Sequence, residues 1–290
     1  MSGWPGMMEG LRSLVAPVME GVRSVMGEPF HERLFLEVVG ACVAGHLALF
    51  THIKALSPRM PTAKAFALAY EVLVAPVFLY MAWKGWRAYQ AFEFPISKDE
   101  QLGPLGLLDL LWSHPAMDRL CNFCQAFYVY DLFVAFAKEP AMIPHHVMMV
   151  GASRVAKMPY ANYTAYFFAG IVELSNVPLR MVNIFRMMPS LREYKALALI
   201  EMLNMVVFAL LFFFLRIFLW GYLSFTLTMS AEAHIRRGVI AKDLAVASRV
   251  GSVLLAGFTV MQAYWGYKVF NKAVRTVSKV LSPKAAPKED

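Results

Sequence analysis

The stretch ALALIEMLNMVVFALLFFFLRIFLWGYLSF, residues Ala196–Phe225, is the most apolar part of the chain and decides its fold class. A helix needs about 20 apolar residues to cross the hydrocarbon core of a bilayer, and this stretch exceeds that length. It also holds three residues that are costly inside a membrane, Glu201, Asn204 and Arg216. The stretch therefore predicts a membrane-spanning helix whose three polar residues are candidates for a functional role.

The composition of the whole chain agrees with a membrane protein. Hydrophobic residues make up 59% of the 290 residues and charged residues 17%, whereas a soluble domain averages about 45–50% and about 25%. The mean hydropathy is +0.50, and 22 Phe, 12 Tyr and 6 Trp argue against disorder. Three cysteines are too few for a disulfide scaffold. These numbers favour a polytopic α-helical membrane protein.

The chain is basic, with a formal net charge of +8. In a membrane protein such charges gather in loops and tails, where they meet anionic lipid headgroups. We find no basic and aromatic motif of the kind that binds nucleic acid. We therefore expect membrane lipids as partners and no nucleic acid.

Seven segments are apolar enough to cross or enter the bilayer. Aromatic residues such as Trp83, Trp86 and Trp220 lie near their ends, as they do in interfacial belts. We expect an all-α membrane bundle of about seven helices over residues 34–271, in which the fourth segment is too short to cross without flanking residues. The segments are Leu34–Ile53, Phe66–Trp83, Leu120–Ala137, Ile143–Val155, Tyr160–Met181, Ala196–Phe225 and Ser248–Phe270.

Both ends of the chain differ from this bundle. Within residues 1–33, the region Met8–Met26 contains two similar copies eleven residues apart, which predicts an amphipathic helix on the membrane surface or against another subunit. Residues 272–290 form a basic tail, and Lys268 and Lys272 begin a basic helical face. The polar connection Glu93–Asp118 predicts a short interfacial helix.

Ionisable side chains inside the spans mark a candidate site. Asp131 shares a helix face with Cys124 and Tyr128, and the next segment opens with Pro144-His145-His146, where proline suits a first helical turn. In the fifth segment helical spacing predicts a polar stripe along one face, kinked beside Asn176 by Pro178. That stripe contains Tyr166, Gly170, Glu173, Asn176, Arg180 and Asn183.

Three interpretations of these residues remain open. They can wall a polar cavity that binds a lipid headgroup. They can form a buried ion-pair network that only fixes helix packing, with Arg180 or Arg216 neutralising Glu173 or Asp131. A histidine held by a carboxylate can also act as a general base.

Other motifs in the sequence give little evidence for a particular chemistry. Cys121-Asn122-Phe123-Cys124 lacks the second cysteine pair of a structural zinc site, and we read its cysteines as small residues for helix packing. The chain has no phosphate-binding GxxxxGK[ST] motif and no GxSxG or HExxH hydrolase motif. We expect no metal and no cofactor.

Taken in order, several of these residues resemble the TLC domain, the membrane domain of translocation-associated proteins, ceramide synthases and CLN8-like proteins. The resemblance covers roughly Phe66 to Phe270 and is nearest to the small members that are not ceramide synthases. It is carried by Tyr130-Asp131-Leu132, His145-His146, Glu173-Leu174-Ser175-Asn176-Val177-Pro178-Leu179, Asn204 and Phe212-Phe213-Phe214-Leu215-Arg216.

The resemblance implies a bundle of six or seven helices around a lipid-accessible cavity, usually in the endoplasmic reticulum. In ceramide synthases, paired histidines and a second His-Asp-x-x-Asp cluster transfer an acyl group from acyl-CoA to a sphingoid base. His145-His146 match the first element. In the second, Val172 stands in place of the histidine and Asn176 in place of the last aspartate, which argues against ceramide synthesis.

Our leading hypothesis is a multi-pass protein that binds or moves a lipid in a polar-lined cavity without catalysis. The candidate headgroup or cavity residues are Asp131, His145, His146, Glu173, Asn176, Arg180, Asn204 and Arg216. The second hypothesis is a structural accessory subunit of a large membrane assembly, for example in the respiratory chain, docked through Met8–Met26 and the basic tail. Its location would then be the mitochondrial inner membrane. The third is an acyl-CoA-dependent acyltransferase that uses His145 and His146.

Overall fold

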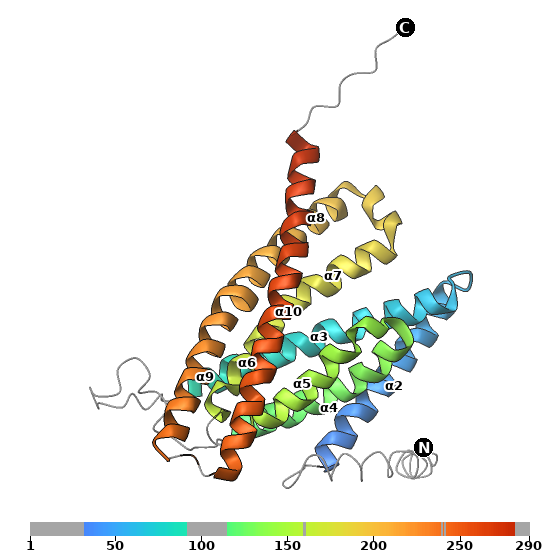
Figure 1. Ribbon diagram of the computed structural model, residues 1–290. Coiled ribbons are helices and arrows are strands. Elements are labelled where there is room, and N and C mark those ends of the chain that lie inside the picture. The colour runs from blue at the N-terminus through green and yellow to red at the C-terminus, as the bar shows by residue number, and fades with distance from the viewer. Residues whose placement is uncertain (1–31, 92–114, 159–160, 239, 241, 282–290) are drawn as a thin grey trace, which may run out of the picture.

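The computed structural model describes residues 32–91, 115–158, 161–238, 240 and 242–281, and this part of the chain is helical and without strands (Figure 1). The all-α bundle predicted from the sequence is therefore confirmed. Its first half consists of α2 (Glu32–Leu56), α3 (Thr62–Ala91), α4 (Pro115–Lys138), the short η2 (Pro140–Met142) and α5 (Ile143–Val155). The predicted interfacial helices in Met8–Met26 and in the connection before Pro115 lie outside the described residues.

The second half begins with short elements and ends with long helices. The short ones are η3 (Asn162–Thr164), α6 (Ala165–Phe168), η4 (Ile171–Ser175), α7 (Asn176–Met187) and η5 (Pro189–Glu193). The long ones are α8 (Lys195–Leu211), η6 (Phe212–Leu219), α9 (Trp220–Arg236) and α10 (Lys242–Leu281). Because α10 continues to Leu281, the start of the predicted basic tail is helical.

Five helical stretches among the described residues are long and apolar enough to cross a membrane. This number and their apolar composition identify an integral membrane protein. The stretches are Arg33–Leu56, Thr62–Ala91, Pro115–Lys138, Lys195–Arg236 and Leu244–Lys272.

The short fourth segment has the predicted bounds, since α5 runs from Ile143 to Val155. Pro144 lies in its first turn, where the missing backbone N–H of proline leaves no helical hydrogen bond unmade. The helix thereby starts directly before His145 and His146, which are both buried, and α5 packs along α4.

The predicted continuous segment Tyr160–Met181 is wrong. The chain is bent at Gly170, which has φ −135° and ψ −86°, and η4 separates this bend from α7. Pro178 does not kink a helix that is already under way. It lies in the first turn of α7, where proline is tolerated. Tyr166 and Gly170 therefore do not share a helix face with the residues after Asn176.

A close crossing explains the bend. A Cβ atom built on Gly170 would lie 2.6 Å from the Cα of Gly85 in α3, and one built on Gly85 would lie 2.4 Å from the carbonyl oxygen of Tyr166. Only glycine allows the two backbones to come this close. At the bend, a Cβ atom on Gly170 would meet both the Tyr166 carbonyl oxygen, at 2.5 Å, and the backbone of α3, so a local contact and a distant one both require glycine.

The helices α8, η6 and α9 join into one helix from Lys195 to Arg236, which is longer than the predicted Ala196–Phe225. A turn at Gly238, with φ +71°, reverses the chain into α10. A glycine with positive φ just past a helix end is a common way to terminate a helix. The two long helices form a hairpin that contacts the rest of the bundle along α5, α7 and η4 (Figure 1).

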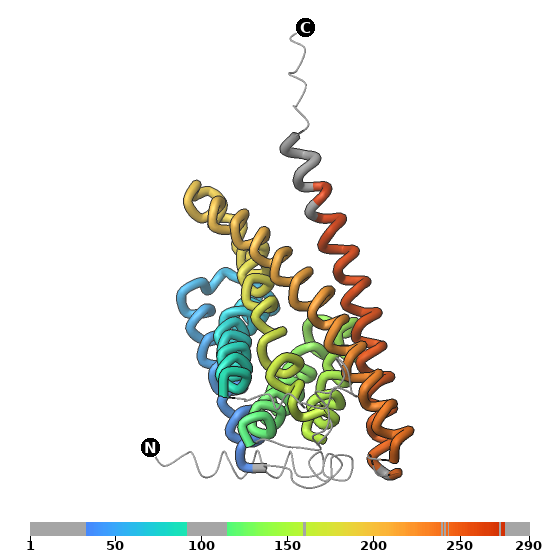
Figure 2. The backbone as a smooth tube through the Cα atoms, turned by 90° about the vertical axis from the view of Figure 1, so that its left-hand side faces the viewer, coloured from blue at the N-terminus to red at the C-terminus, as the bar shows by residue number. Residues whose placement is uncertain are grey.

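The two halves of the bundle pack differently. The helices α2, α3 and α4 contact one another closely, and α4 also packs along α5. Toward the end of the chain, α8 and α10 lie close near η6 and separate toward the start of α8 (Figure 2). The space between these diverging helices, α7 and the packed half is where the candidate site lies.

Candidate functional site

A cavity of about 720 Å³ opens among α3, α4, α5, α7, α8, η6 and α10. One side of its wall is apolar and the other is polar. The α8 side contributes apolar residues such as Met205 and Phe208, whereas α3, α4, α5 and α7 contribute charged groups and amides. Cavities of about 300–1,000 Å³ with an apolar wall and a few convergent polar groups are typical ligand sites.

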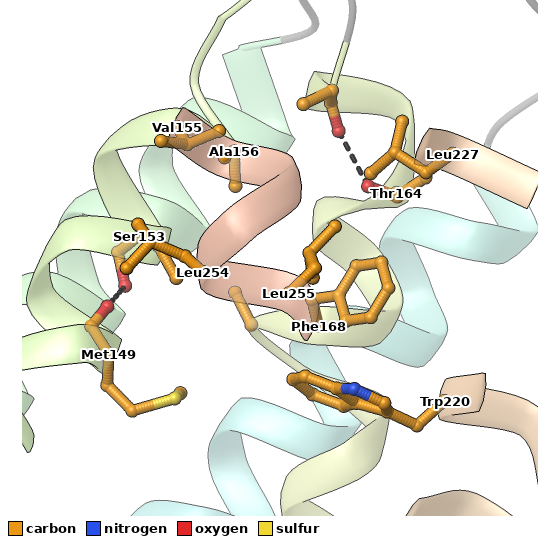
Figure 3. Close-up of a pocket in the computed structure, with 14 residues that line it drawn as sticks. Met149, Ser153, Val155, Ala156, Thr164, Phe168, Trp220, Leu227, Leu254 and Leu255 are labelled. Atoms are coloured by element: carbon orange, nitrogen blue, oxygen red, sulfur yellow. Dashed lines mark hydrogen bonds between the residues drawn. The ribbon is translucent and has the colours of Figure 1, made fainter. Parts of the chain in front are cut away.

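A second, much smaller pocket does not have this character. It measures about 40 Å³ and lies among α5, α6, α9 and α10 (Figure 3). Its hydroxyl groups are used locally, since Ser153 donates to the carbonyl oxygen of Met149 and Thr164 to that of Ala161, each at 2.7 Å. A pocket so small and apolar can hold little more than a methyl group or a water molecule.

Asp131 is the centre of the first polar cluster. Tyr70 of α3 donates its hydroxyl hydrogen bond to Asp131 Oδ1. His146 Nδ1 lies 3.3 Å from Asp131 Oδ2, close enough for an ion pair when the ring is protonated. These two atoms are nevertheless not aligned for a hydrogen bond, and neither has another partner among the described residues. The carboxylate and the imidazole therefore both keep hydrogen-bonding capacity.

His145 lies on the opposite side of this cluster, against α10. Its ring packs edge-to-face on Trp265 and Phe258, with centroid distances of 5.2 and 5.8 Å. The rings of His145 and His146 are 5.1 Å apart. Aromatic packing therefore fixes the His145 ring, and its Nδ1 atom has no hydrogen-bond partner among the described residues.

Glu173 organises a second cluster just behind the cavity wall. It is 1% exposed and does not itself line the cavity. Tyr128 donates to its Oε1 at 2.6 Å, Asn176 donates to its Oε2 at 2.5 Å, and Arg216 Nη2 lies 3.5 Å from the same oxygen. These three partners do line the cavity. Glu173 therefore positions wall residues and does not face the cavity.

Arg216 reaches this cluster from a π-helix. The eight residues of η6 form wider turns than an α-helix, and such turns frequently occur at functional sites. Arg216 is 6% exposed, and its Nε donates to Ser175 Oγ at 2.7 Å. Because a guanidinium so deep in a membrane protein needs partners, the hydroxyl of Ser175 and the carboxylate of Glu173 together satisfy it.

A third cluster surrounds Glu71 of α3. Lys138 donates to Glu71 Oε1, Arg180 Nη1 lies 3.2 Å from Oε2, and Asn183 donates to Oε1 at 3.3 Å. The side chains of Lys138 and Arg180 also stack over the ring of Tyr70, at 4.5 and 5.4 Å. Two cations thus share one buried carboxylate at the cavity wall.

The structure brings together most of the residues predicted from the sequence. Six of them line the cavity, and Glu173 lies behind its wall. Asn204 lies elsewhere, since it donates to the carbonyl oxygen of Pro178 at 2.8 Å and so ties α8 to α7. The six are Asp131, His145, His146, Asn176, Arg180 and Arg216.

Several wall residues were not predicted as part of the site. Glu71 carried a signal, because it is a carboxylate in the apolar segment Phe66–Trp83. Lys268 and Lys272 also line the cavity, on the same α10 face as Trp265. Lys268 follows Trp265 by three residues and Lys272 follows Lys268 by four. This spacing was a usable signal, since it places all three residues on one helix face.

The expected packing role of the cysteines agrees with their burial. Cys42, Cys121 and Cys124 are all buried and carry free thiols. Within the described ranges, no three His, Cys, Asp or Glu side chains come together in a way that could hold a metal ion.

Comparison with known proteins gives one finding. The family model of the TLC domain (TRAM/LAG1/CLN8) matches residues 65–271. No curated protein and no solved structure matches the chain.

Proposed function

Because the chain belongs to the TLC-domain family, we propose that this integral membrane protein binds a membrane lipid in the cavity described above. The single observation that carries the proposal is a cavity of about 720 Å³ that joins polar groups on one side to an apolar, lipid-facing helix on the other. An amphiphile needs both kinds of surface. We further propose that the lipid is bound or passed on without chemical change.

The size of the cavity supports a partly enclosed ligand. A whole two-chain lipid exceeds 720 Å³, so only its headgroup region would be enclosed. The chains would then lie along α8, where Met202, Val206 and Leu210 are exposed and also line the cavity. This arrangement leaves the apolar part of the lipid in the membrane, where it needs no further burial.

Unused hydrogen-bonding groups support a polar ligand. Four buried atoms around the cavity have no partner among the described residues: His145 Nδ1, His146 Nδ1, Asp131 Oδ2 and Arg180 Nε. A buried polar atom without a partner costs about 1–3 kcal/mol. Hydroxyl, ester or phosphate oxygens of a headgroup, together with water, are suitable partners for these donors and acceptors.

The contacts of Val172 and Asn176 support binding over acyl transfer. Val172 is fully buried and offers no proton-transfer group. Asn176 is held by its hydrogen bond to Glu173. Of the second cluster of ceramide synthases, only the acid therefore has a counterpart in this chain, Glu173.

Acyl transfer, the third hypothesis from the sequence, is kept as a candidate because of one observation, the approach of His146 Nδ1 to within 3.3 Å of Asp131. A carboxylate beside an imidazole can support general-base catalysis. Incubation with labelled acyl-CoA and long-chain bases separates the two functions. We expect no acylated product. If wild type forms an acylated long-chain base and the His146→Ala variant does not, the acyltransferase function is favoured.

The binding proposal is tested by lipid occupancy. The full chain is purified in mild detergent as wild type, as the double variant His145→Ala/Glu173→Gln and as His52→Ala. His52 is exposed and lies outside the cavity. We expect several-fold less co-purified lipid with the double variant and no change with His52→Ala. Unchanged occupancy in a double variant that still unfolds cooperatively would contradict the proposal.

Family membership also supports a location in the endoplasmic reticulum. Fluorescence microscopy of the tagged full chain beside markers of the endoplasmic reticulum and of mitochondria tests this location. Colocalisation with the mitochondrial marker would instead favour the inner membrane.

A further inference from the structure

The charged residues of the cavity wall are unequally divided. Six of the lining residues are lysine or arginine, and three are aspartate or glutamate. Two of the cations, Lys138 and Arg180, share Glu71, and Arg216 faces Glu173. The wall has three further cations, Arg186, Lys268 and Lys272, and two further carboxylates, Asp131 and Glu139. We call these three cations the cationic mouth.

Helix geometry places the cationic mouth at one end of the cavity. Along α7 the lining residues follow at helical spacing from Asn176 through Arg180 and Asn183 to Arg186. At 1.5 Å per residue, Arg186 lies about 15 Å beyond Asn176 along the axis of α7. On α10, Lys272 lies about 10 Å beyond Trp265. Both helices therefore lead from the histidine cluster to the same cationic end.

The side chains of the cationic mouth are exposed. Among the described residues, Arg186 and Lys268 form no ion pair, and the Lys268 ammonium lies 4.3 Å from the centre of the Tyr264 ring. Lys272 is close enough to interact electrostatically with Arg186, Arg192 and Glu201. Glu201 is itself held by two hydrogen bonds from Arg192, at 2.5 and 2.6 Å. Positive charge thus prevails at this end of the cavity.

The same end of the cavity opens toward lipid. The start of α8 diverges from α10 there (Figure 2). Met202, Val206 and Leu210 of α8 line the cavity and are also 51%, 53% and 66% exposed. A ligand can therefore reach the cationic mouth sideways from the membrane, with its apolar chains remaining against α8.

We propose that the ligand of the cavity is an anionic phospholipid whose phosphate is bound by Arg186, Lys268 and Lys272. This inference rests on the proposed lipid-binding function and adds the charge class of the headgroup. A phosphate has the geometry and charge that arginine and lysine bind well. A zwitterionic headgroup is disfavoured, because its ammonium group would approach the cationic mouth, where Arg186 and Lys268 form no ion pair among the described residues.

The experiment uses the full chain in nanodiscs of phosphatidylcholine that contain one-tenth of a labelled probe lipid. The probe is photo-crosslinkable phosphatidylglycerol in one arm and photo-crosslinkable phosphatidylcholine in the other. We expect wild type to crosslink phosphatidylglycerol at least tenfold more than phosphatidylcholine. Each surface cation contributes about 1 kcal/mol to the attraction of an anionic lipid, and about 1.4 kcal/mol is a factor of ten.

A matched pair of variants isolates the cationic mouth. In Arg186→Gln/Lys268→Gln/Lys272→Gln the preference should fall to about twofold or less. The control Arg59→Gln/Arg87→Gln/Arg237→Gln loses the same charge from exposed sites that do not line the cavity, and it should keep the wild-type preference. Thermal unfolding of each variant verifies that all of the substitutions leave the fold intact.

The outcomes separate this inference from the proposed function. Equal crosslinking of the two probes by wild type would overturn the anionic headgroup and leave lipid binding standing. A preference that survives in the mouth variant, or that falls equally in the control, would also overturn it. Crosslinking of neither probe would overturn the proposed function as well. A preference that weakens with added salt in wild type would support it, because salt screens exposed charges.

Discussion

The helices α3 and α4 and the long helix from Lys195 to Arg236 are all apolar enough to cross a membrane, yet their surroundings are opposite. Much of the apolar part of α3 and α4 is buried inside the protein, whereas most of the long helix from Lys195 to Arg236 faces outward. Phe127 of α4 is fully buried, and Phe218 of η6 is 68% exposed. Hydropathy therefore identifies membrane helices but does not separate those that pack on protein from those that face lipid.

The largest effect is expected where two backbones of the packed half cross closely. In Gly85→Ala the new Cβ would lie 2.4 Å from the Tyr166 carbonyl oxygen and 2.8 Å from the Gly170 Cα. Because these are backbone atoms, they cannot rotate away, and we expect a loss of about 3 kcal/mol or more. Thermal unfolding in detergent measures it. Gly40→Ala in α2 is the control, since nothing lies within 4 Å of its Cβ position. Equal midpoints for the two variants would contradict the close crossing.

Replacing one phenylalanine by alanine in each half should have unequal effects on stability. Phe127→Ala should cost about 3 kcal/mol, because it removes a fully buried ring from contacts with Phe78, Tyr128 and Tyr130 and leaves a cavity. Phe218→Ala should change stability by less than about 0.5 kcal/mol, because its ring is mostly exposed. Unfolding of both variants by a denaturing detergent gives the comparison. If Phe218→Ala were the more destabilising, the outer half would be packed against something other than lipid.

The smallest effect tests a single hydrogen bond in the packed half. Tyr130 of α4 donates to His46 Nδ1 at 2.8 Å, and His46 Nε2 donates to the Phe66 carbonyl oxygen at 3.0 Å, so one imidazole joins α2, α3 and α4. Tyr130→Phe should cost about 1 kcal/mol, the usual net value of a buried hydrogen bond. Tyr222→Phe on the exposed face of α9 should cost nothing measurable in the same unfolding assay. A Tyr130→Phe variant as stable as wild type would show that this hydrogen bond does not stabilise the fold.

Much of the fold could be predicted because the signals were local. The apolar run Ala196–Phe225 predicts its helix, and Pro144 predicts the start of α5, without any knowledge of neighbouring helices. Helical spacing also placed Tyr128 and Asp131 on one face of α4, and both line the cavity. These inferences need only the period of the helix and the conformational restriction of proline.

The remaining features depend on contacts between distant residues. At the bend, Gly170 lies against Gly85 of α3, which is far away in the sequence. The spacing of Glu173 placed it among the cavity residues, yet the bend turns it behind the wall. Spacing also could not choose a partner for Arg180, which pairs with Glu71 and not with Glu173 or Asp131. Which charges meet is decided by the path of the backbone between helices.

The length of the hairpin has a consequence for how the protein meets water. The helix from Lys195 to Arg236 has 42 residues, or roughly 63 Å, and even at a tilt of about 40° it covers roughly 48 Å along the membrane normal. The hydrocarbon core is about 30 Å thick. Part of the hairpin therefore stands in the aqueous phase as helix whose backbone is already hydrogen-bonded. Proteolytic cleavage concentrates at exposed loop tips and chain ends, so a helical segment that projects from the membrane is a poorer protease target than a loop in the same place.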